Sequence, residues 1–376
     1  FDEASGLWHL DTSNGPITAR ALITATGQLN RPAWPNLPGR DRFAGETFHS
    51  ARWDHDVDLT GKTVAVIGTG ASAIQFVPEI AKQAKQVLLF QRSAPYVIPK
   101  PDRPYSATEQ RLMARFPLLQ KLDRARVYAQ NEARVLGFTS LQGAMRFHEY
   151  LFKKHLRECV PDPDTRAKLT PDYPMGCKRI LISNDYYQAL TKYRIPVITG
   201  GVRAITADGV EDIDGEHHQA DVIIYGTGFQ ATDFLAPMAI TGRRGQDLNQ
   251  AWRDGAEAYL GISVHGFPNL FMLYGPNTNL GHNSIIYMIE SQIAYVVSAL
   301  ETLERDGHRF VDVRPGVQDD FNRRLQARMR DTVWDQGCES WYKTASGKNT
   351  NNWPGFTFSY RQRTRHLDPE DYELHP

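Results

Sequence analysis

Cysteine is scarce in this sequence. The three cysteines, Cys159, Cys177 and Cys338, are far apart and form no C-x-x-C pair. A zinc ribbon and a dithiol reductase are excluded, because both need closely spaced cysteines, and we predict no metal site. Free thiols are typical of a reducing compartment, and no signal peptide is visible. We therefore expect a cytoplasmic protein.

Long apolar runs and an excess of one charge are also missing. Runs such as residues 87–90 are far shorter than the roughly 20 residues that a membrane-spanning helix needs. Lysine plus arginine number 43 and aspartate plus glutamate number 43, so the net charge is zero. This balance favours neither nucleic acid nor an anionic membrane as a partner. With 376 residues, 41% of them hydrophobic, the chain is long enough for two or more domains.

A strand, a glycine-rich turn and a helix follow one another in the first third of the chain. The patterns predict a strand over residues 62–67, a helix over 74–84 and a second strand over 87–90. In a G-x-G-x-x-A turn, the first glycine permits the tight turn, the second lets a pyrophosphate approach, and the third small residue lets helix and strand pack. With both flanking elements present, dinucleotide binding is favoured over a purely structural turn. The turn consists of Gly68, Thr69, Gly70, Ala71, Ser72 and Ala73.

The end of the second strand indicates which coenzyme binds. Sites for NAD carry an acidic residue there, about 20 residues after the turn, that holds the ribose 2′-hydroxyl. This sequence has Gln91, Arg92 and Ser93 instead. The planar donors of arginine suit a 2′-phosphate, so we predict NADP, the alternative being an ordinary surface arginine.

Residues 43–54 carry the most specific pattern, F-x-G-x-x-x-H-x-x-x-W-[P/D]. In this stretch the chain resembles the Baeyer–Villiger monooxygenases, which are class B flavoprotein monooxygenases. Related flavin-containing monooxygenases and N-hydroxylases usually carry Tyr or Phe where Trp53 stands. The fixed positions of this fingerprint are Phe43, Gly45, His49, Trp53 and Asp54.

The resemblance covers essentially the whole chain and implies roles for further residues. Residues 25–27 and 226–228 resemble the family's two linker motifs, and residues 274–284 resemble its second flavin contact. The contacts to FAD that this implies are Thr26, Gly27, Gly228, Phe229, Asn277, Asn283 and Ser284. A helix beginning near Ser284 would direct its N-terminal dipole toward the negative charge of a reduced flavin.

A Lys-Arg pair at 178–179 resembles the family's segment in which lysine joins the 2′-phosphate site and arginine reaches over the flavin. Taken alone, such a pair is more often a solvated surface charge. The resemblance implies that Arg179 is catalytic, and a fixed guanidinium suits an anionic oxygen. Trp341 resembles a residue of the mobile loop that closes over NADP. The implied NADP contacts are therefore Gly68, Thr69, Gly70, Ser72, Ala73, Arg92, Ser93, Lys178 and Trp341.

Other elements follow from local patterns. Ser106 and Glu109 predict a capping box that opens a helical region reaching to about residue 158. Residues 210–213 and 221–225 predict a hairpin, and residues 270–274 predict a buried strand. The helix after residue 284 is expected to bury an apolar stripe of Ile285, Ile289, Ile293, Val296, Val297 and Leu300.

The chain opens with Phe1 inside a predicted hairpin formed by residues 7–10 and 17–24. The family's first G-x-G-x-x-G, which holds the FAD pyrophosphate, has no counterpart before Gly27, and neither has the family's catalytic aspartate. We therefore expect an N-terminally truncated piece of a longer protein, with an incomplete FAD domain.

Together the patterns predict an α/β fold with two Rossmann-like dinucleotide-binding domains. We assign residues 1–29 and 216–376 to the FAD domain, residues 30–100 and 172–215 to the NADP domain, and residues 101–171 to a helical insertion.

The resemblance implies an NADPH-dependent flavin monooxygenase. It would use O₂ to insert one oxygen atom into a ketone through a C4a-peroxyflavin, giving an ester or lactone. One alternative is oxygenation at sulfur or nitrogen, against which Trp53 argues. Another is a non-catalytic NADP-binding module, which would need neither Arg179 nor flavin contacts.

Overall fold

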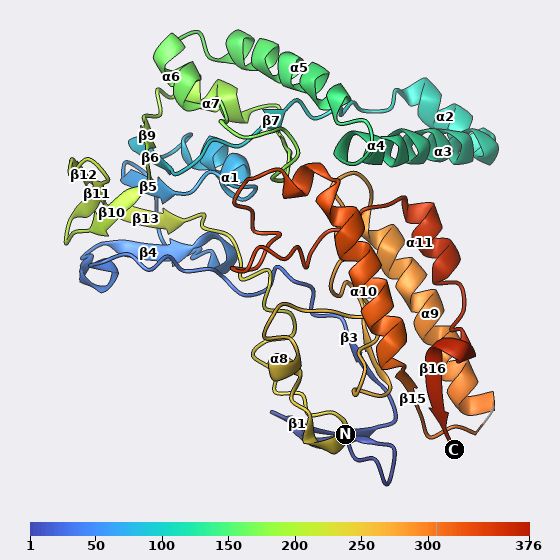
Figure 1. Ribbon diagram of the computed structural model, residues 1–376. Coiled ribbons are helices and arrows are strands. Elements are labelled where there is room, and N and C mark those ends of the chain that lie inside the picture. Colours follow the sequence, from blue (N-terminus) through green and yellow to red (C-terminus); the bar gives the residue numbers. More distant parts are fainter. Residues whose placement is uncertain (306) are drawn as a thin grey trace. The chain divides into compact units, whose positions relative to one another are not determined.

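The computed structural model describes residues 1–305 and 307–376, which form two compact units (Figure 1). Unit 1 comprises Phe1–Gln28, Ser106–Gln142 and Ala231–Pro376. Unit 2 comprises Leu29–Tyr105 and Gly143–Gln230. Each unit is thus assembled from segments that are far apart in the sequence.

Unit 2 is built on a five-stranded parallel sheet with the strand order β4-β13-β5-β6-β9. Its central strands are almost completely buried, with residues 64–66 and 223–225 at 0% exposure. Parallel strands are covered on both faces, which explains their continuous apolar sequence. The strands are β4 (Glu46–His49), β5 (Thr63–Ile67), β6 (Gln86–Gln91), β9 (Val197–Thr199) and β13 (Val222–Tyr225).

Unit 2 also contains helices and short strands that are not part of this five-stranded sheet. A three-stranded antiparallel sheet has the order β10-β11-β12, and a short parallel pair joins β7 to β8. The elements are η1 (Arg40–Arg42), η2 (Ser50–Arg52), α1 (Ala73–Ile80), β7 (Val97–Ile98), α5 (Gly143–Cys159), α6 (Pro163–Lys168), β8 (Leu181–Ile182), α7 (Tyr186–Lys192), β10 (Val202–Ile205), β11 (Gly209–Asp212) and β12 (His217–Gln219).

Unit 1 contains three two-stranded sheets. The parallel pair β3–β14 sets Leu22 opposite Leu270 and Thr24 opposite Met272, while β1–β2 and β15–β16 are antiparallel. The strands are β1 (Trp8–Thr12), β2 (Gly15–Ala19), β3 (Leu22–Thr24), β14 (Leu270–Met272), β15 (Phe310–Val313) and β16 (Tyr372–His375). Trp8 is 3% exposed and its indole Nε1 donates to the Pro268 carbonyl oxygen at 2.9 Å, which ties β1 to the segment before β14.

Helices make up much of the rest of unit 1. Helices α9 and α11 lie side by side, drawn in orange and red in Figure 1. The helical elements are α2 (Ala107–Arg115), α3 (Pro117–Ala133), α4 (Val135–Phe138), η3 (Arg243–Gly245), α8 (Leu248–Ala251), α9 (Ile285–Arg305), α10 (Pro315–Arg330), η4 (Val333–Asp335), α11 (Thr357–Arg363) and η5 (Pro369–Asp371).

The structure corrects the predicted boundary at residue 216. Strand β13 belongs to unit 2, because it pairs in parallel with β4 on one side and with β5 on the other. Residues 216–230 therefore lie in the unit of the glycine-rich turn and not with the remainder of 216–376. The predicted hairpin is wrong for the same reason, since the partner of β11 is β12 and not β13.

The predicted insertion at residues 101–171 is not one body. The capping box is present, as Ser106 accepts from the Glu109 backbone and the Glu109 side chain accepts from the Ser106 backbone. Residues 106–142 nevertheless belong to unit 1, where Glu132 of α3 bonds to Thr357 at the start of α11. Residues 101–105 and 143–171 belong to unit 2, where Phe152 of α5 packs on Tyr96 with ring centroids 4.9 Å apart.

Helix α9 begins as predicted, but only part of the predicted stripe is buried. Val296 is 4% exposed, whereas Ile293 and Val297 are 45% and 47% exposed, and Gln292 and Tyr295 are buried in addition. These two polar side chains have internal partners, which lowers the free energy of burying them. The Gln292 side chain accepts from the Tyr274 amide and donates to the Tyr360 hydroxyl, and the Tyr295 hydroxyl donates to that of Tyr372.

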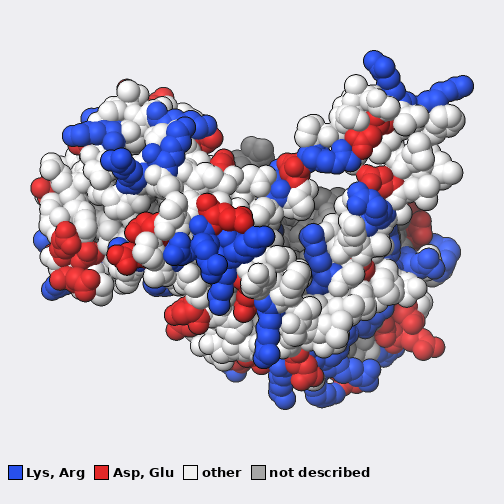
Figure 2. All heavy atoms as spheres, turned by 90° about the horizontal axis from the view of Figure 1, so that it is seen from above, with Lys and Arg blue, Asp and Glu red and all other residues white. Residues whose placement is uncertain are grey.

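The predictions about cysteines, membrane-spanning segments and charge can be compared with the structure. Cys159 carries a free thiol, but Cys177 and Cys338 are disulfide-bonded, so the expectation of free thiols is wrong for these two. Within the described residues, no helix combines the length and apolarity that crossing a membrane requires. Basic and acidic side chains are interspersed over the face drawn in Figure 2, in keeping with the balanced composition.

Candidate active site

The glycine-rich turn has the geometry that its residue types predicted. Gly68 adopts a φ of +110°, and a Cβ there would collide with the carbonyl oxygen of Gly226. At Gly70 a Cβ would meet no heavy atom within 4 Å, so open space faces the backbone. Ala73 is fully buried. The small size of each of these three residues is therefore explained by the space around it, as the sequence pattern predicted.

Helix α1 begins directly after this turn. Its N-cap is Ser72, whose side chain makes no capping hydrogen bond. Backbone N–H groups at a helix start need an acceptor, and the helix dipole favours an anion there. The turn and the helix together form a candidate pyrophosphate site.

Residues at the end of β6 surround the candidate 2′-phosphate position. Gln91 is buried and its Nε2 donates to the Lys168 carbonyl oxygen at 2.7 Å, while Arg92 is exposed. The Thr69 hydroxyl donates to the Ser93 carbonyl oxygen at 3.2 Å, and Lys178 Nζ donates to the Ser93 hydroxyl at 3.2 Å. The structure thus brings Thr69, Ser93 and Lys178 together.

Arg179 follows this cluster in the sequence. Its side chain is exposed, whereas the Lys178 ammonium lies 4.5 Å from the ring centre of Tyr173. The two cations of the pair therefore have different surroundings.

The fingerprint packs against the dinucleotide site within unit 2. A Cβ on Gly45 would collide with the carbonyl oxygen of Asp221, next to β13, so only glycine fits. The Trp53 ring lies 5.1 Å from Phe48 of β4 and 5.3 Å from Phe76 of α1, measured between centroids. Trp53 therefore connects the fingerprint to the helix that follows the glycine-rich turn.

The other fingerprint residues support this loop. Phe43 packs at the edge of the apolar cluster beneath the sheet. His49 is 0% exposed, its Nδ1 accepts from the Ala51 amide at 3.0 Å, and burial lowers its pKa, so the imidazole is neutral. Asp54 accepts from the Asp56 amide at 3.0 Å. Phe43 and His49 therefore support the loop from its inner side, and Asp54 holds a turn at its surface.

The predicted flavin contacts fall into two groups. Thr26 and Gly27 follow β3, and Asn277, Asn283 and Ser284 follow β14, all in unit 1. Because β3 and β14 are parallel neighbours, their carboxyl ends meet, which is where α/β sheets bind ligands. Gly27, with a φ of +65°, has its Cβ position 4.0 Å from the Tyr274 ring.

Asn277 and Asn283 have structural partners in unit 1. The Asn277 amide is 3% exposed and donates to the carbonyl oxygens of Asn349 and Asn352 at 2.8 and 3.1 Å. The Asn283 amide donates to Glu132 at 2.6 Å, and its oxygen accepts from the Ser284 backbone. Both residues hold the loop that leads into α9.

Gly228 and Phe229 lie in unit 2, apart in sequence and in unit from the other predicted flavin contacts. The Gly228 carbonyl oxygen accepts from the Ala33 amide at 2.9 Å, and Phe229 forms a bridge with Pro32. Trp341 lies in unit 1, where its ring centroid is 4.3 Å from that of Tyr342. The other predicted NADP contacts are all in unit 2.

One group of possible metal ligands lies away from these residues. Oxygen or nitrogen atoms of Asp212, Glu216 and His218 lie within 4.8 Å of one another. His218 Nε2 and Asp212 are 2.9 Å apart, and the other Asp212 oxygen accepts from the backbones of Asp214 and Glu216. These bonds close the turn between β11 and β12.

Proteins of known sequence share this arrangement over nearly the whole chain. A Baeyer–Villiger monooxygenase of Pseudomonas aeruginosa is 49% identical over 377 residues, covering 100% of this chain and 72% of the relative. The chain belongs to the Baeyer–Villiger monooxygenase family. A second Baeyer–Villiger monooxygenase, of Streptomyces coelicolor, is 43% identical, covering 98% of this chain and 71% of that protein. The pyridine nucleotide-disulphide oxidoreductase family pattern also matches residues 2–136.

Solved structures agree with this membership. A steroid monooxygenase bound to NADP has a TM-score of 0.86 at 29% identity, and the match covers 100% of this chain and 79% of that chain. Cyclohexanone monooxygenase from Rhodococcus sp. Phi1, bound to NADP⁺, has a TM-score of 0.87 at 25% identity, covering 100% and 78%. The family, the monooxygenase class and the α/β fold class predicted from the sequence are confirmed.

Sequence reasoning missed the contacts of several residues at the site of this Baeyer–Villiger family member. The Thr227 hydroxyl donates to the Ala33 carbonyl oxygen at 2.6 Å, and the Trp34 ring lies 5.4 Å from both His49 and Tyr225. Proline at positions 32 and 35 marks this segment as a connector, but it does not indicate the partners of the segment. Glu132 had no local signal, since its partners are about 150 to 226 residues away.

His282 is a further residue that sequence reasoning missed. It is 5% exposed, and neither ring nitrogen has a hydrogen-bond partner among the described residues. Burial lowers the pKa of His282 to about 4, with the nearby Glu132 acting in the opposite direction. A neutral imidazole is therefore buried beside the predicted flavin contact Asn283.

Proposed function

We propose that the protein carries out a Baeyer–Villiger oxidation of a ketone. A ketone, O₂, NADPH and a proton give an ester or lactone, NADP⁺ and water, so one oxygen atom enters the product and the other leaves as water. The observation that carries this proposal is the complete fingerprint, packed through Trp53 onto the helix of the G-x-G-x-x-A turn. Membership of the family supports it.

The residues of unit 2 fit NADP. Open space at Gly70 and the start of α1 suit a pyrophosphate. Arg92 and Lys178 would hold the 2′-phosphate, since both are cations near the end of β6 and no acidic residue stands there to select NAD. We therefore assign NADP to unit 2.

The residues of unit 1 fit contacts to a flavin. Gly27 follows the carboxyl end of β3, and Ser284 is exposed where the 21-residue helix α9 begins. A helix start favours negative charge, and a reduced flavin carries such charge. FAD, when bound, supplies the transfer of electrons from NADPH and the activation of O₂. Thr26, Asn277 and Asn283 would shape this contact.

Arg179 is the proposed catalytic residue. A guanidinium is permanently charged, so it stabilises an oxyanion at the substrate carbonyl without itself exchanging a proton. Lys178, held by Ser93, keeps the pair anchored to unit 2. We propose that the loop carrying Trp341 closes over bound NADP. We also propose that the protein is located in the cytoplasm.

Product analysis tests the proposal. The purified protein is supplied with FAD, NADPH, ¹⁸O₂, and either a cyclic ketone or a thioether. We expect a lactone carrying one ¹⁸O atom and a matched loss of NADPH. A sulfoxide without any lactone would instead identify a sulfur-oxygenating enzyme, and NADP binding without oxidation of either substrate would identify a binding module.

Substitution of Arg179 separates binding from chemistry. Arg179→Ala should leave substantial NADPH binding, because Arg92 and Lys178 remain, but should abolish the lactone and release the consumed oxygen as hydrogen peroxide. Arg179→Lys is the matched control that keeps the charge but loses the planar donors. A normal lactone yield from Arg179→Ala would remove this residue from the mechanism.

A further inference from the structure

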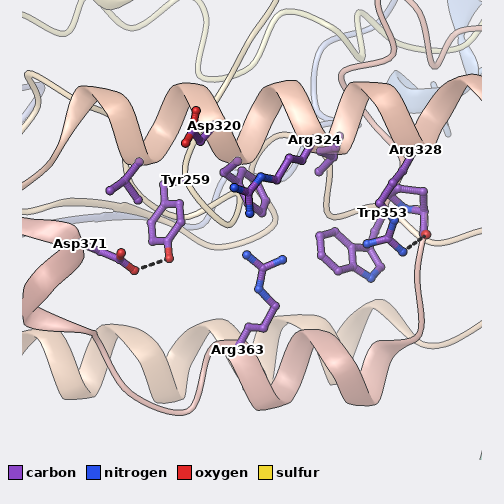
Figure 3. Close-up of a pocket in the computed structure, with 11 residues that line it drawn as sticks. Tyr259, Asp320, Arg324, Arg328, Trp353, Arg363 and Asp371 are labelled. Atoms are coloured by element: carbon purple, nitrogen blue, oxygen red, sulfur yellow. Dashed lines mark hydrogen bonds between the residues drawn. The ribbon is translucent and has the colours of Figure 1, made fainter.

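A hollow of about 430 Å³ lies within unit 1 between α10 and α11 (Figure 3). Figure 3 shows Arg324 and Arg328 extending into it from α10 and Arg363 from the end of α11. The volume is in the range of small-molecule sites. None of the cofactor or catalytic residues discussed above lines it.

The three arginines have no acidic partners. Across the described residues, no carboxylate oxygen lies within 4.0 Å of their guanidinium groups. Two acids also line the hollow: Asp320 pairs with Arg323, and Asp371 accepts from the neutral Tyr259 hydroxyl at 2.5 Å. The three cations therefore outnumber the one carboxylate that no cation pairs with, and their net positive charge would attract an anion.

Two of the guanidinium groups are fixed in place. Arg328 Nη2 donates to the Pro354 carbonyl oxygen at 2.9 Å, and the Arg363 guanidinium carbon lies 5.3 Å from the ring centre of Phe321. A guanidinium has five N–H donors, so one bond leaves Arg328 with donors to spare. Fixed donors lose little entropy on binding a ligand.

The floor of the hollow is apolar. Phe321 and Trp353 line it and are 8% and 2% exposed, and Leu325 lies between the arginines on α10 at 4%. An apolar floor beneath charged donors suits a ligand with an anionic group and an apolar body.

We propose that this hollow binds a small phosphate monoester with an apolar or aromatic body. Arginine forks match the oxygens of phosphate, and a doubly charged group suits three converging cations better than a singly charged carboxylate does. The site is separate from the residues assigned to NADP, all of which except Trp341 are in unit 2. The hollow is therefore a small-molecule site lined by none of the residues proposed to contact NADP or FAD.

Calorimetric titration of the whole chain with phenyl phosphate tests the proposal. We expect binding that weakens with added salt, because the contacts are ionic. Arg324→Gln and Arg363→Gln should each weaken binding about tenfold or more, the usual effect of losing a charge-assisted hydrogen bond. Phenol, which lacks the phosphate, should not bind at the same concentrations.

Three comparisons locate the site and define its ligand. Arg330→Gln removes a charge from the same helix outside the hollow, and Arg92→Ala removes one from the proposed NADP site, so both should retain phenyl phosphate binding. An equal loss in either control would overturn the location.

Inorganic phosphate binding as tightly as phenyl phosphate would overturn the assignment to an ester, and benzoate binding as tightly would overturn the choice of phosphate. Absence of phenyl phosphate binding by a folded protein would overturn the proposal itself.

Discussion

Two glycines that face each other in unit 2 differ in what they tolerate. Gly68 has a φ of +110° and its Cβ position collides with the Gly226 carbonyl oxygen. Gly226 is different, because a Cβ there would lie 3.5 Å from that of Ala73, an ordinary van der Waals distance. Alanine therefore fits at position 226 of this chain.

Substitution by alanine should separate the two glycines. Gly68→Ala should lower the free energy of unfolding by on the order of 1–3 kcal/mol and abolish NADP binding, because the strained turn must move. Gly226→Ala should change stability by no more than about 1 kcal/mol and keep NADP binding. Denaturant unfolding and NADP titration measure both effects. Equal losses of stability and NADP binding from the two substitutions would contradict the close approach of Gly68 to the Gly226 carbonyl oxygen.

Arg92 should determine the choice of coenzyme. Arg92→Ala removes a charge-assisted contact to the 2′-phosphate and should weaken NADPH binding roughly tenfold to a hundredfold, with little effect on NADH. Lys82→Ala, at the far end of α1 where Lys82 pairs with Glu79, is the matched control. The measurement is the coenzyme dependence of flavin reduction. Similar losses with NADPH and NADH would rule out the assignment.

His282 should make stability depend on pH. Its folded pKa of about 4 lies below the unfolded value near 6.5, so the unfolded chain binds the proton more tightly. The stabilisation is complete above about pH 6.5 and is lost as the pH falls toward 4, by about 3 kcal/mol at most. Urea unfolding between pH 7 and pH 4.5 should show a shallower pH dependence in His282→Gln. His366→Gln, at an exposed site in the same unit, should match the unsubstituted protein.

At the scale of elements, local patterns were predicted well and long-range pairings were not. The strand at β5, the turn, the start of α9 and the Ser106 capping box all follow from residues within about ten positions. Strand β13 was placed in the wrong domain because its neighbours, β4 and β5, come more than 150 residues earlier. The buried face of α9 was predicted only in part, because Gln292 and Tyr295 find partners that no local pattern reveals. The residue types of the site were predictable, but the division of its residues between two units was not.

Glu132 should anchor two elements at once. Its carboxylate accepts from the Thr357 amide, the Thr357 hydroxyl and the Phe358 amide at 2.5, 2.8 and 3.3 Å, and from the Asn283 side chain at 2.6 Å. Glu132→Ala leaves buried donors unpaired and should lower the free energy of unfolding by about 2–4 kcal/mol. Glu132→Gln keeps the shape of the side chain and should lower the free energy of unfolding by less than Glu132→Ala does.

The control for Glu132 lies on the same helix. Asp123 pairs with Arg126 at the surface of α3, so Asp123→Ala should change stability by less than about 0.5 kcal/mol. Thermal and urea unfolding of the three variants give the comparison. A loss in Glu132→Ala no larger than that in Asp123→Ala would show that the capping of α11 contributes little.

At the scale of the molecule, the chain passes between the units four times, after Gln28, Tyr105, Gln142 and Gln230. The hydrogen-bonded strands within each unit pair with strands of that same unit. Such internally bonded bodies are candidates for separate cooperative units of unfolding. The proposed NADP contacts lie in unit 2 except for Trp341, and this uneven distribution gives a way to observe separate unfolding.

A ligand stabilises only the cooperative unit that must unfold to release it, by about 2.7 kcal/mol at a free concentration of 100 times Kd. With NADP⁺ at that concentration, buried amides of β5 and β6 in unit 2 should exchange their hydrogens about a hundredfold more slowly. Buried amides of α9 and β15 in unit 1 should change little, because unit 1 can open without releasing the ligand. Hydrogen exchange measured by mass spectrometry resolves these segments. NAD⁺ at the same concentration is the control. It lacks the 2′-phosphate that Arg92 and Lys178 would hold, so it should slow exchange in unit 2 less. Equal slowing in both units would mean that they unfold together, and slowing confined to unit 1 would contradict the assignment of NADP to unit 2.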